Sequence, residues 1–499
     1  MSGIYGYALS YGAAALLLVL LTIPLLRRLA FYADFVDRPA GRKRHEEAVP
    51  PISGLAIFPI FVILLFLSGT EPSSIWIIAS IGIILAVGAI DDGFSLPAWV
   101  KLIVQVGVAV LIVVPGHIRV YGFGDLFGFG DIGTSWIGIP FTIMAVVLVI
   151  NAINLIDGLD GLAGGLGLII IFWLAVCSIV AGDSRNLIVT SIFAGALIGF
   201  LNYNLRHRFR EKASVFLGNS GSQAMGLTLA WLTIEPSQGG TAIIQPISVA
   251  WLLALPIYDI CGQFARRVYL GRHPFDPDRH HFHHHFLYAG LSDGQATAII
   301  LALSFFAGIV GVGGLWIGIP ESVLTYVWIV FLFIHIYMSM LPLRYLKLLL
   351  PLRGKSIDNI IGQLILESGA ISEAQLLDAL ELQGKSGGKI GEILIEKGYI
   401  SESNLIYFLN LQVVRNANTN IVNVNKKKDF LLGEIMLTSK MITKDQLEEG
   451  LIYQRTKGGW IGQVLLSMGY ISESDLRDCL EKQIQYRYAD RASGVDIEI

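Results

Sequence analysis

The sequence predicts an all-α polytopic membrane protein with about eleven transmembrane helices, followed by a C-terminal cytoplasmic, mainly α-helical repeat domain. Two observations support this fold class. Of the 499 residues, 54% are hydrophobic and only 15% are charged, which is too apolar for a soluble protein of this size. The apolar character ends near residue 350, and the rest of the chain has the composition of ordinary soluble modules.

Net charge and cysteine content argue against several classes of function. The net charge of −3 gives no support for binding to nucleic acid. The three cysteines are scattered and form no CxxC pair, so neither a zinc site nor a disulfide framework is indicated.

Apolar runs long enough to cross a bilayer lie at 8–26, 52–68, 74–90, 99–115, 136–153, 166–181, 187–203, 223–234, 245–262, 296–318 and 323–342. The first run lacks a basic n-region and a small-residue cleavage site, so we interpret it as a span rather than a removed signal peptide. Lys and Arg gather in alternate loops, at 27–44, 204–213, 263–294 and after 342. Because cytoplasmic loops carry the excess of positive charge, the N-terminus is predicted outside and the tail in the cytoplasm.

The stretch 151–165, NAINLIDGLDGLAGG, places Asp157 and Asp160 at the end of an apolar run. Charge is costly near hydrocarbon, so an ionisable residue there is a functional-site hypothesis. Carboxylates three residues apart lie on one helix face or around one turn and can share a cation. The alternative is a helix cap with a glycine turn, which explains one Asp better than two.

A second acidic pair, Asp91 and Asp92, precedes GFSLPA beside the third apolar run. Solvated acids at the membrane interface are the alternative for this pair taken alone. Together the two pairs supply four carboxylates, a pattern suited to Mg²⁺ holding a phosphate-rich substrate. The predicted topology puts both pairs on the cytoplasmic face, where an active site at a membrane surface needs them.

Two more motifs fall on the same predicted face. The tract RHHFHHH at 279–285 suits a cationic, hydrogen-bonding grip on phosphates, and a transition-metal site is the alternative. The segment FLGNSGS at 216–222 is a glycine-serine loop that opens a helix, where free backbone N–H groups can face a phosphate. An ordinary capped turn explains the same loop.

In this order, DDGFSLPA, NAINLIDGLDGLAGG, FLGNSGS and PFDPDRHHFHHHF resemble the motifs of the polyprenyl-phosphate N-acetylhexosamine-1-phosphate transferases, over residues 1–345. The resemblance implies a bacterial inner (plasma) membrane enzyme that transfers a sugar-1-phosphate from a UDP-sugar to undecaprenyl phosphate and releases UMP. Such a step initiates a cell-surface polysaccharide, and the family uses Mg²⁺. Undecaprenyl phosphate, the UDP-sugar and membrane lipids are therefore the expected partners.

The resemblance also implies roles for individual residues. The expected catalytic residues are the four carboxylates Asp91, Asp92, Asp157 and Asp160. The expected substrate-binding residues are Asn154, Arg279, His281, His283, His284, Arg42, Lys43 and His45. The expected metal ligands are Asp157, Asp160 and Asn219. Asn219 departs from the family, which usually has Asp there, and an amide oxygen binds Mg²⁺ without supplying charge, so a lower affinity is expected.

The expected mechanism is direct displacement by an oxygen of the lipid phosphate at the β-phosphorus of the UDP-sugar. The second pKa of a phosphate monoester is about 6, so the nucleophile is already mostly dianionic at neutral pH. Asp91 and Asp92 are then expected to act mainly through position and charge, although a general-base role for one of them stays open.

The tail contains a 29-residue repeat, at 361–383, 390–412, 432–454 and 461–483. It is predicted to form a helical repeat pair at 356–412, a linker at 413–430 and a second pair at 431–485. The repeats resemble the N-terminal domain of type II secretion and pilus ATPases, some of which bind cyclic-di-GMP. The nucleotide-binding versions begin each unit with Arg, whereas here only Lys389 keeps a positive charge at that place. The tail is expected to sense cyclic-di-GMP or a protein partner; a scaffold without a ligand is the alternative.

Two rival functions remain for the whole chain. A transporter of a lipid-linked sugar predicts charged residues within spans and broken helices that meet at the midplane, whereas here the charges gather at one face. A catalytically weakened transferase, kept as a membrane anchor for the tail, is supported by Asn219 alone.

Overall fold

The computed structural model describes residues 2–38, 48–70, 74–206, 210, 212–271, 273, 281–289, 291–340, 349, 361–386, 389–402, 404–405, 408–409, 436–437, 439, 441–457 and 461–479. The chain divides into two compact units. One comprises Met1–Ile357 with Leu380–Gly388, and the other comprises Asp358–Ala379 with Lys389–Ile499. We call them the membrane unit and the tail unit, and each is described by itself.

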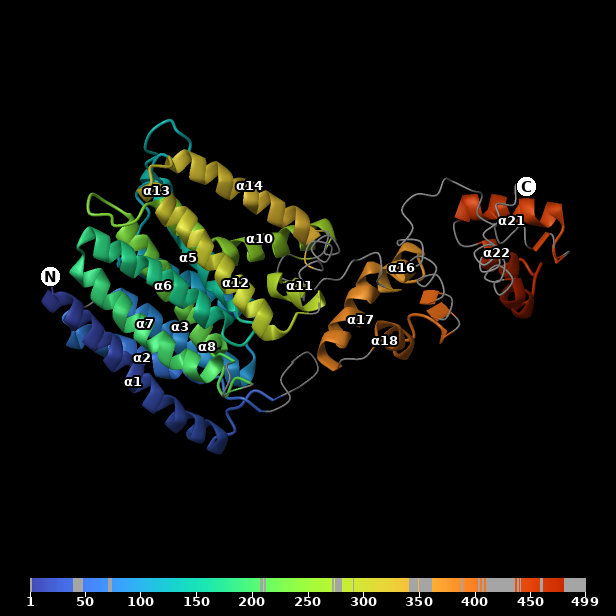
Figure 1. Cartoon of the computed structure of the whole chain (residues 1–499). Coiled ribbons are helices and arrows are strands. Elements are labelled where there is room, and N and C mark those ends of the chain that lie inside the picture. Colours follow the sequence, from blue (N-terminus) through green and yellow to red (C-terminus); the bar gives the residue numbers. More distant parts are fainter. Residues whose placement is uncertain are drawn as a thin grey trace, which may run out of the picture. The chain divides into compact units, whose positions relative to one another are not determined.

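The membrane unit is a bundle of helices (Figure 1). Its α-helices are α1 (Ser2–Tyr32), α2 (Ser53–Leu67), α3 (Ile75–Phe94), α4 (Ala98–Val113), α5 (Gly138–Ile156), α6 (Leu162–Ala181), α7 (Ser184–Asn204), α8 (Gly218–Ile234), α9 (Pro246–Leu252), α10 (Ala254–Tyr269), α11 (Phe282–Tyr288), α12 (Asp293–Gly308), α13 (Gly314–Trp316) and α14 (Glu321–Met340). A π-helical segment, η3 (Ile309–Gly313), joins α12 to α13. In the described part, β-structure is limited to two isolated bridges, so the all-α prediction is confirmed.

Membrane-crossing length separates these helices into two groups. In the described part of the chain, seven helices are long and apolar enough to cross a bilayer, and the count is eight if α9 and α10, which meet at a 71° bend, form one span. Eleven spans are predicted from the sequence, so fewer described helices than predicted meet this length and composition criterion. Every predicted run overlaps a helix, but α2, α4 and α8 have only 15, 16 and 17 residues, whereas about 20 are needed to cross the hydrocarbon core.

The short helix α8 lies at the centre of the bundle. Its residues from Ser220 to Ile234 are all buried, and it packs against α2, α3 and α5. Glycine allows this close approach, because a Cβ on Gly88 of α3 would lie 2.4 Å from the Cα of Ser220. A Cβ on Gly54 of α2 would lie 2.5 Å from the Cα of Gly221. The start of α8 is thereby held against the end of α3.

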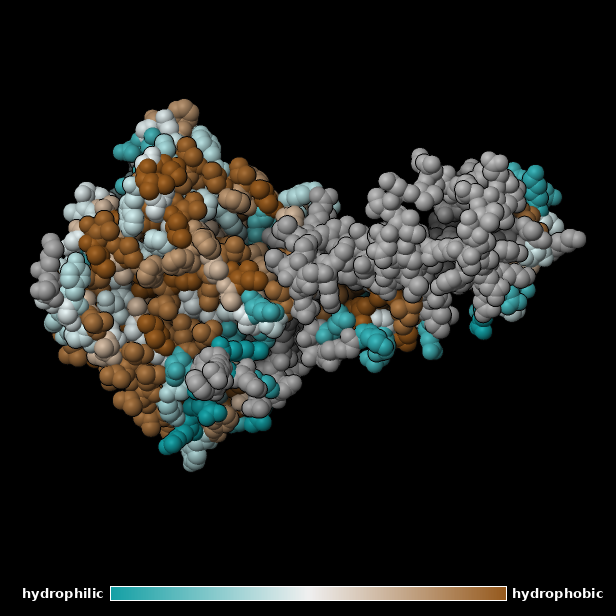
Figure 2. Space-filling view, in the orientation of Figure 1, coloured by the Kyte–Doolittle hydropathy of each residue, from teal (hydrophilic) through white to brown (hydrophobic). Residues whose placement is uncertain are grey.

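The outer surface of the membrane unit is apolar. Figure 2 shows hydrophobic side chains over much of it, and α1 and α14 expose many large apolar residues, such as Leu21 and Phe333. A surface of this kind suits contact with lipid. The chain crosses the bundle back and forth, so the ends of α3, α5 and α7 lie at the same end as the starts of α4, α6, α8 and α12. The sequence motifs meet there. Which side of the membrane this end faces stays a prediction.

The described helices of the tail follow the repeat. They are α16 (Ile361–Glu367), α17 (Glu373–Ser386), α18 (Ile390–Glu396), α21 (Lys444–Lys457) and α22 (Ile461–Ser467). The hydroxyl of Tyr399 donates to Asp378 at 2.8 Å, and the hydroxyl of Tyr470 donates to Glu449 at 2.6 Å. Each pair is separated by 21 residues, so the same contact recurs in both repeat pairs. The predicted linker lies outside the described residues, and the predicted domain boundaries stay predictions.

Candidate active site

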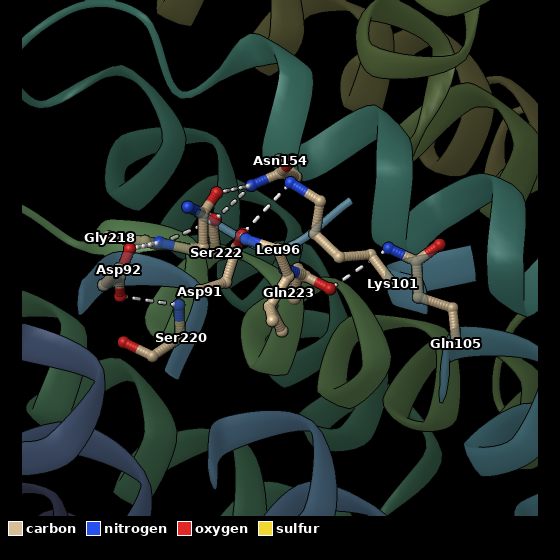
Figure 3. Close-up of polar contacts among 11 residues, drawn as sticks. Asp91, Asp92, Leu96, Lys101, Gln105, Asn154, Gly218, Ser220, Ser222 and Gln223 are labelled. Atoms are coloured by element: carbon tan, nitrogen blue, oxygen red, sulfur yellow. Dashed lines mark hydrogen bonds and ion pairs between the residues drawn. The ribbon is translucent and has the colours of Figure 1, made fainter. Parts of the chain in front are cut away.

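Asp91 ties the end of α3 to α4. One carboxylate oxygen accepts a hydrogen bond from the backbone N–H of Leu96 at 2.7 Å, and the other lies 3.0 Å from the Lys101 ammonium (Figure 3). Asp91 is only 4% exposed, and α3 is followed by Ser95, whose φ of 52° places it in the left-handed region. Both oxygens of Asp91 are thus engaged in closing the turn and holding Lys101.

Asp92 caps the start of α8 instead. Its two oxygens accept hydrogen bonds from the backbone N–H groups of Asn219 at 2.7 Å and Ser220 at 3.1 Å (Figure 3). A carboxylate is favourable there because the first N–H groups of a helix lack partners and carry the positive end of its dipole. The sequence predicts that N–H groups of this loop face a phosphate, but in the structure these two are taken by Asp92.

Asn154 lies near the end of α5, just before the loop that carries Asp157 and Asp160, which we call the acidic loop. It connects this part of the chain to the start of α8. Its side-chain nitrogen donates to the amide oxygen of Asn219 at 3.1 Å and to the hydroxyl of Ser222 at 2.8 Å. The Asn219 oxygen, expected to bind a metal, therefore accepts a hydrogen bond in this structure. Asn219 reaches Asp92 through its backbone and Asn154 through its side chain.

A chain of buried amides continues from the site into the bundle. Gln105 donates to Gln223 at 3.1 Å (Figure 3). Asn151 in turn donates to Gln105 at 2.7 Å. Gln105 and Gln223 are 3% and 4% exposed. These contacts join α4, α5 and α8 behind the carboxylates, and they satisfy polar groups that would be costly in an apolar bundle. Sequence reasoning missed both glutamines, although a polar side chain in an apolar run is itself a signal.

Asp157 and Asp160, on the loop after α5, differ in their partners. Among the described residues, the Asp157 carboxylate has no hydrogen-bond or ion-pair partner. Burial, together with the negative charges of Asp92 and Asp160, raises the pKa of Asp157 to about 7. Asp160 instead accepts hydrogen bonds from Arg206 at 2.7 Å and from the Ala213 N–H at 3.2 Å.

Arg206 also joins the acidic loop to α12. Its guanidinium lies 2.7 Å from Asp293, the first residue of that helix, as well as 2.7 Å from Asp160. Burial lowers the pKa of Arg206, but the two carboxylates outweigh it, and the net change is upward. Asp160 is thereby fixed between three segments of the bundle.

The histidine motif reaches the acidic loop through His283. A Cβ on Gly158, next to Asp157, would lie 2.5 Å from Nε2 of His283, so this imidazole packs directly on the loop. The ring of His281 is parallel to that of His283 at 5.9 Å, and the His284 ring lies 4.2 Å from His283. His281 and His283 are 6% and 2% exposed.

The structure therefore brings part of the predicted site together. The joined residues are Asp92, Asn154, Asp157, Asn219, His281, His283 and His284. Asp91 and Asp160 are held by cations beside them. Arg42, Lys43, His45 and Arg279 lie outside the described residues. Sequence reasoning missed Lys101, Arg206 and Asp259, whose contacts depend on tertiary packing.

The predicted Mg²⁺ site can be tested against these contacts. Within the described ranges, no three His, Cys, Asp or Glu side chains are close enough to hold a metal. Asp157 fits a cation well, since its carboxylate has no partner among the described residues, and burial and the neighbouring carboxylates make its own charge unfavourable. Asp160 is already paired with Arg206, and the Asn219 oxygen already accepts a hydrogen bond. The oxygen-rich chemistry fits Mg²⁺ around Asp157, and the full ligand set stays a prediction.

Comparison with known proteins gives consistent results. Residues 74–237, from α3 through α8, match the family model described as glycosyl transferase family 4. The chain is 32% identical over 335 residues to the undecaprenyl-phosphate alpha-N-acetylglucosaminyl 1-phosphate transferase of Salmonella typhimurium, which covers 66% of this chain and 90% of that protein. It is 30% identical over 315 residues to the Escherichia coli K12 protein of the same name, covering 62% and 85%.

A relative from a third organism is similar to the same extent. The chain is 31% identical over 298 residues to the probable undecaprenyl-phosphate N-acetylglucosaminyl 1-phosphate transferase of Bacillus subtilis, with coverage of 59% and 81%. None of these comparisons supports the predicted resemblance of the tail to secretion and pilus ATPases.

Proposed function

The chain belongs to glycosyl transferase family 4 and is an enzyme of its sugar-1-phosphate transferase type, and from this premise we propose that it transfers N-acetylglucosamine 1-phosphate from a UDP-sugar to undecaprenyl phosphate. N-acetylglucosamine is proposed because the names of the relatives specify it. The product would start a cell-surface polysaccharide, and we place the enzyme in the bacterial inner membrane with its active site on the cytoplasmic side.

One observation in the structure carries the proposal. Asp92, Asp157 and His283 come from three distant parts of the sequence, and they meet at one end of an apolar bundle. Such a place suits a reaction between a nucleotide sugar from water and a lipid phosphate from the membrane. A transporter would need its polar site near the bilayer midplane, whereas these groups lie at helix ends.

The proposed reaction is one in-line displacement at phosphorus. An oxygen of the lipid phosphate attacks the β-phosphorus of the UDP-sugar, and a new phosphoanhydride bond forms. The bond from that phosphorus to the bridging oxygen breaks, and UMP leaves with the oxygen. A dianionic lipid phosphate needs no base, so the residues act by holding charges in position.

Each side chain has a proposed part in that arrangement. Mg²⁺ bound at Asp157, with Asp160 and Asn219 as further proposed ligands, would supply positive charge to the diphosphate. His281, His283 and His284 would donate hydrogen bonds to phosphate oxygens as imidazolium groups. Asp92 sets the position of α8, and Lys101 adds a cation near the same helix ends. Arg42, Lys43, His45 and Arg279 are proposed as further phosphate contacts.

The test is UMP release by the purified protein in detergent, with Mg²⁺, undecaprenyl phosphate and a panel of UDP-sugars. Release that needs the lipid, is fastest with UDP-N-acetylglucosamine and disappears in Asp157→Asn would support the proposal. UMP release with a different UDP-sugar alone would support a transferase activity with that sugar as its substrate. No release with any donor, even in Asn219→Asp, would favour a membrane anchor for the tail.

We also propose that the tail regulates the transferase by binding cyclic-di-GMP or a protein partner. Its support is the recurrence of the Tyr399–Asp378 and Tyr470–Glu449 contacts, which indicates two folded copies of one module. The test is calorimetric titration of cyclic-di-GMP into the full-length protein, with UMP release measured in parallel. If no heat of binding is measured, regulation by cyclic-di-GMP is refuted, and regulation by a protein partner is the proposal that remains.

A further inference from the structure

A buried carboxylate outside the sequence motifs holds the histidine motif in place. Asp259 lies on α10 and is 1% exposed. One of its oxygens lies 3.1 Å from Nδ1 of His281, and the other accepts a hydrogen bond from the backbone N–H of Phe282 at 2.8 Å. Asp259 therefore contacts both the His281 imidazole and the first residue of α11.

These two contacts determine which nitrogen of His281 carries the proton. An ionised carboxylate can only accept hydrogen bonds. The Phe282 N–H is a donor, so it favours an ionised Asp259, and Nδ1 of His281 must then carry a proton to be bonded at 3.1 Å. A neutral His281 consequently has its unshared electron pair on Nε2.

Nothing else in the described part competes for this ring. Asp259 is the one hydrogen-bond partner of His281 there, and the remaining contacts of its ring are with His283 and His284. The titratable groups whose charges act on Asp259 are His281, His283 and, from α14, His335. Asp259 thus lies among imidazoles.

Contacts between imidazole rings connect His281 to the acidic loop. His281 stacks parallel on His283, and His283 packs on Gly158, which is next to Asp157. A change in the tautomer or tilt of His281 would therefore alter the surroundings of the unpartnered carboxylate. Asp259 does not touch this loop itself, so its effect has to pass through His281.

We propose that Asp259 is a positioning residue of the transferase: it fixes His281 with the proton on Nδ1 and leaves Nε2 as the nitrogen that meets a substrate phosphate. The proposal rests on the transferase function proposed above. A carboxylate behind an imidazole also stabilises the imidazolium form, which donates to a phosphate oxygen through Nε2. Substitution of such a supporting residue usually lowers activity about 10- to 100-fold.

The first test is a double-mutant cycle on UMP release by the full-length protein. Asp259→Asn should lower kcat by about 10- to 100-fold and leave the KM for the UDP-sugar nearly unchanged. His281→Gln should lower kcat at least as much. The double variant should be no slower than His281→Gln alone, because Asp259 acts through that ring. Losses that multiply in the double variant would contradict the proposal.

Matched variants separate positioning from folding. Tyr258→Phe removes a buried hydrogen bond of the same helix, from the Tyr258 hydroxyl to the Trp328 carbonyl at 2.8 Å, without touching His281. It should keep kcat while lowering the unfolding temperature. Asp259→Glu keeps the carboxylate on a longer side chain and should recover part of the activity lost in Asp259→Asn. Equal losses in Asp259→Asn and Tyr258→Phe would indicate a structural role only.

The second test does not depend on activity. Nitrogen-15 NMR of histidine-labelled protein at pH about 9, where ordinary imidazoles are neutral, reports the tautomer of each ring. The His281 signal is identified by its loss in His281→Gln. It should show a protonated Nδ1 in the unsubstituted protein and shift towards a protonated Nε2 in Asp259→Asn. A protonated Nε2 in the unsubstituted protein would overturn the proposal. If UMP is never released but the tautomer is as expected, only the transferase function fails.

Discussion

The two acidic pairs of the membrane unit share one arrangement. In each pair, one carboxylate is held by a cation and the other is not. Asp91 lies 3.0 Å from Lys101, and Asp160 lies 2.7 Å from Arg206. Asp92 caps α8 through two backbone N–H groups, and Asp157 has no partner among the described residues. The comparison teaches that a carboxylate's role follows from its partners rather than from its motif.

The members of the two pairs that no cation holds also differ from each other. Asp92 accepts two backbone hydrogen bonds at a helix start, whereas Asp157 accepts none from the described residues, and burial and neighbouring acids raise its pKa to about 7. Asp157 is therefore the carboxylate that a bound cation would stabilise most. The four predictions below test this ranking of the carboxylates.

The largest effect is expected from Asp157→Asn. Losing the unpartnered carboxylate should lower kcat for UMP release by about 10³-fold or more, as when a group that stabilises transition-state charge is removed. Asp160→Asn is the matched control at the other end of the motif, and its loss should be smaller because Arg206 already engages that carboxylate. Equal losses in both variants would mean that both carboxylates act directly.

Asp92→Asn should rank second, with a loss in kcat of about 100-fold. An amide oxygen can still accept one N–H, but the helix start loses a charge-assisted cap that contributes about 1 kcal/mol of stability. Asp91→Asn should affect activity less and stability more, since it leaves the Lys101 charge without its partner. Kinetics and thermal unfolding of both variants check the order. If Asp91→Asn has a lower kcat than Asp92→Asn, the order proposed for the two carboxylates of this pair is reversed.

The third prediction concerns pH and stability without Mg²⁺. The pKa of folded Asp157 is about 7, against an ordinary value of 3.8, so its ionisation opposes folding increasingly from pH 4 to 7 and fully above pH 7. Asp157→Asn removes this cost. With a chelator present, the variant should be more stable than the unsubstituted protein at pH 8, by about 2 kcal/mol after allowance for solvent screening.

Near pH 4 the two proteins should unfold at similar temperatures, because Asp157 is then protonated in both the folded and the unfolded state. Thermal unfolding in detergent across this pH range measures the difference. Asp160→Asn should show no such gain, since Arg206 compensates that charge. A gain at pH 8 that persists unchanged at pH 4 would show that Asp157 titration is not its cause.

The smallest effect is expected from Gly88→Ala, which tests how α8 is held against Asp92. The new Cβ would lie 2.4 Å from the Cα of Ser220, so the two helices must separate, at a cost of about 1 to 3 kcal/mol. Gly82→Ala is the control on the same helix, because its Cβ meets nothing within 4 Å. It should be neutral or slightly stabilising. Equal unfolding temperatures for both variants would refute the tight contact.

Much of the fold could be predicted from the sequence. Every predicted apolar run overlaps a helix, because hydrophobic length is a local property of the chain. Fewer of the described helices than predicted have the length of a full span. The run that became α8 reads as a crossing, but it is a 17-residue helix at the centre of the bundle. Its burial by α2, α3 and α5 depends on glycines far away in the sequence.

The candidate site was predicted in part. The motifs identified Asp92, Asp157, Asn154 and the histidines because polar groups in an apolar chain are conspicuous. They did not identify Lys101 and Arg206, which lie near helix ends, or Asp259, which lies within α10, since a single basic or acidic residue is common and needs no function. Only a contact made across the fold distinguishes such a residue, as Asp259 shows with His281.

By itself, the sequence determined that this chain is an all-α membrane protein and that its polar motifs gather at one end of the bundle. Both follow from local hydrophobicity and from the alternating direction of successive helices. The tertiary structure alone decided which carboxylates are paired and which one has no partner among the described residues. Asp92 meets Asn219 across 127 residues, and Asp160 meets Arg206 across 46. Contacts at such separations arise only when helices pack, and charge on a buried carboxylate depends on what packing places beside it.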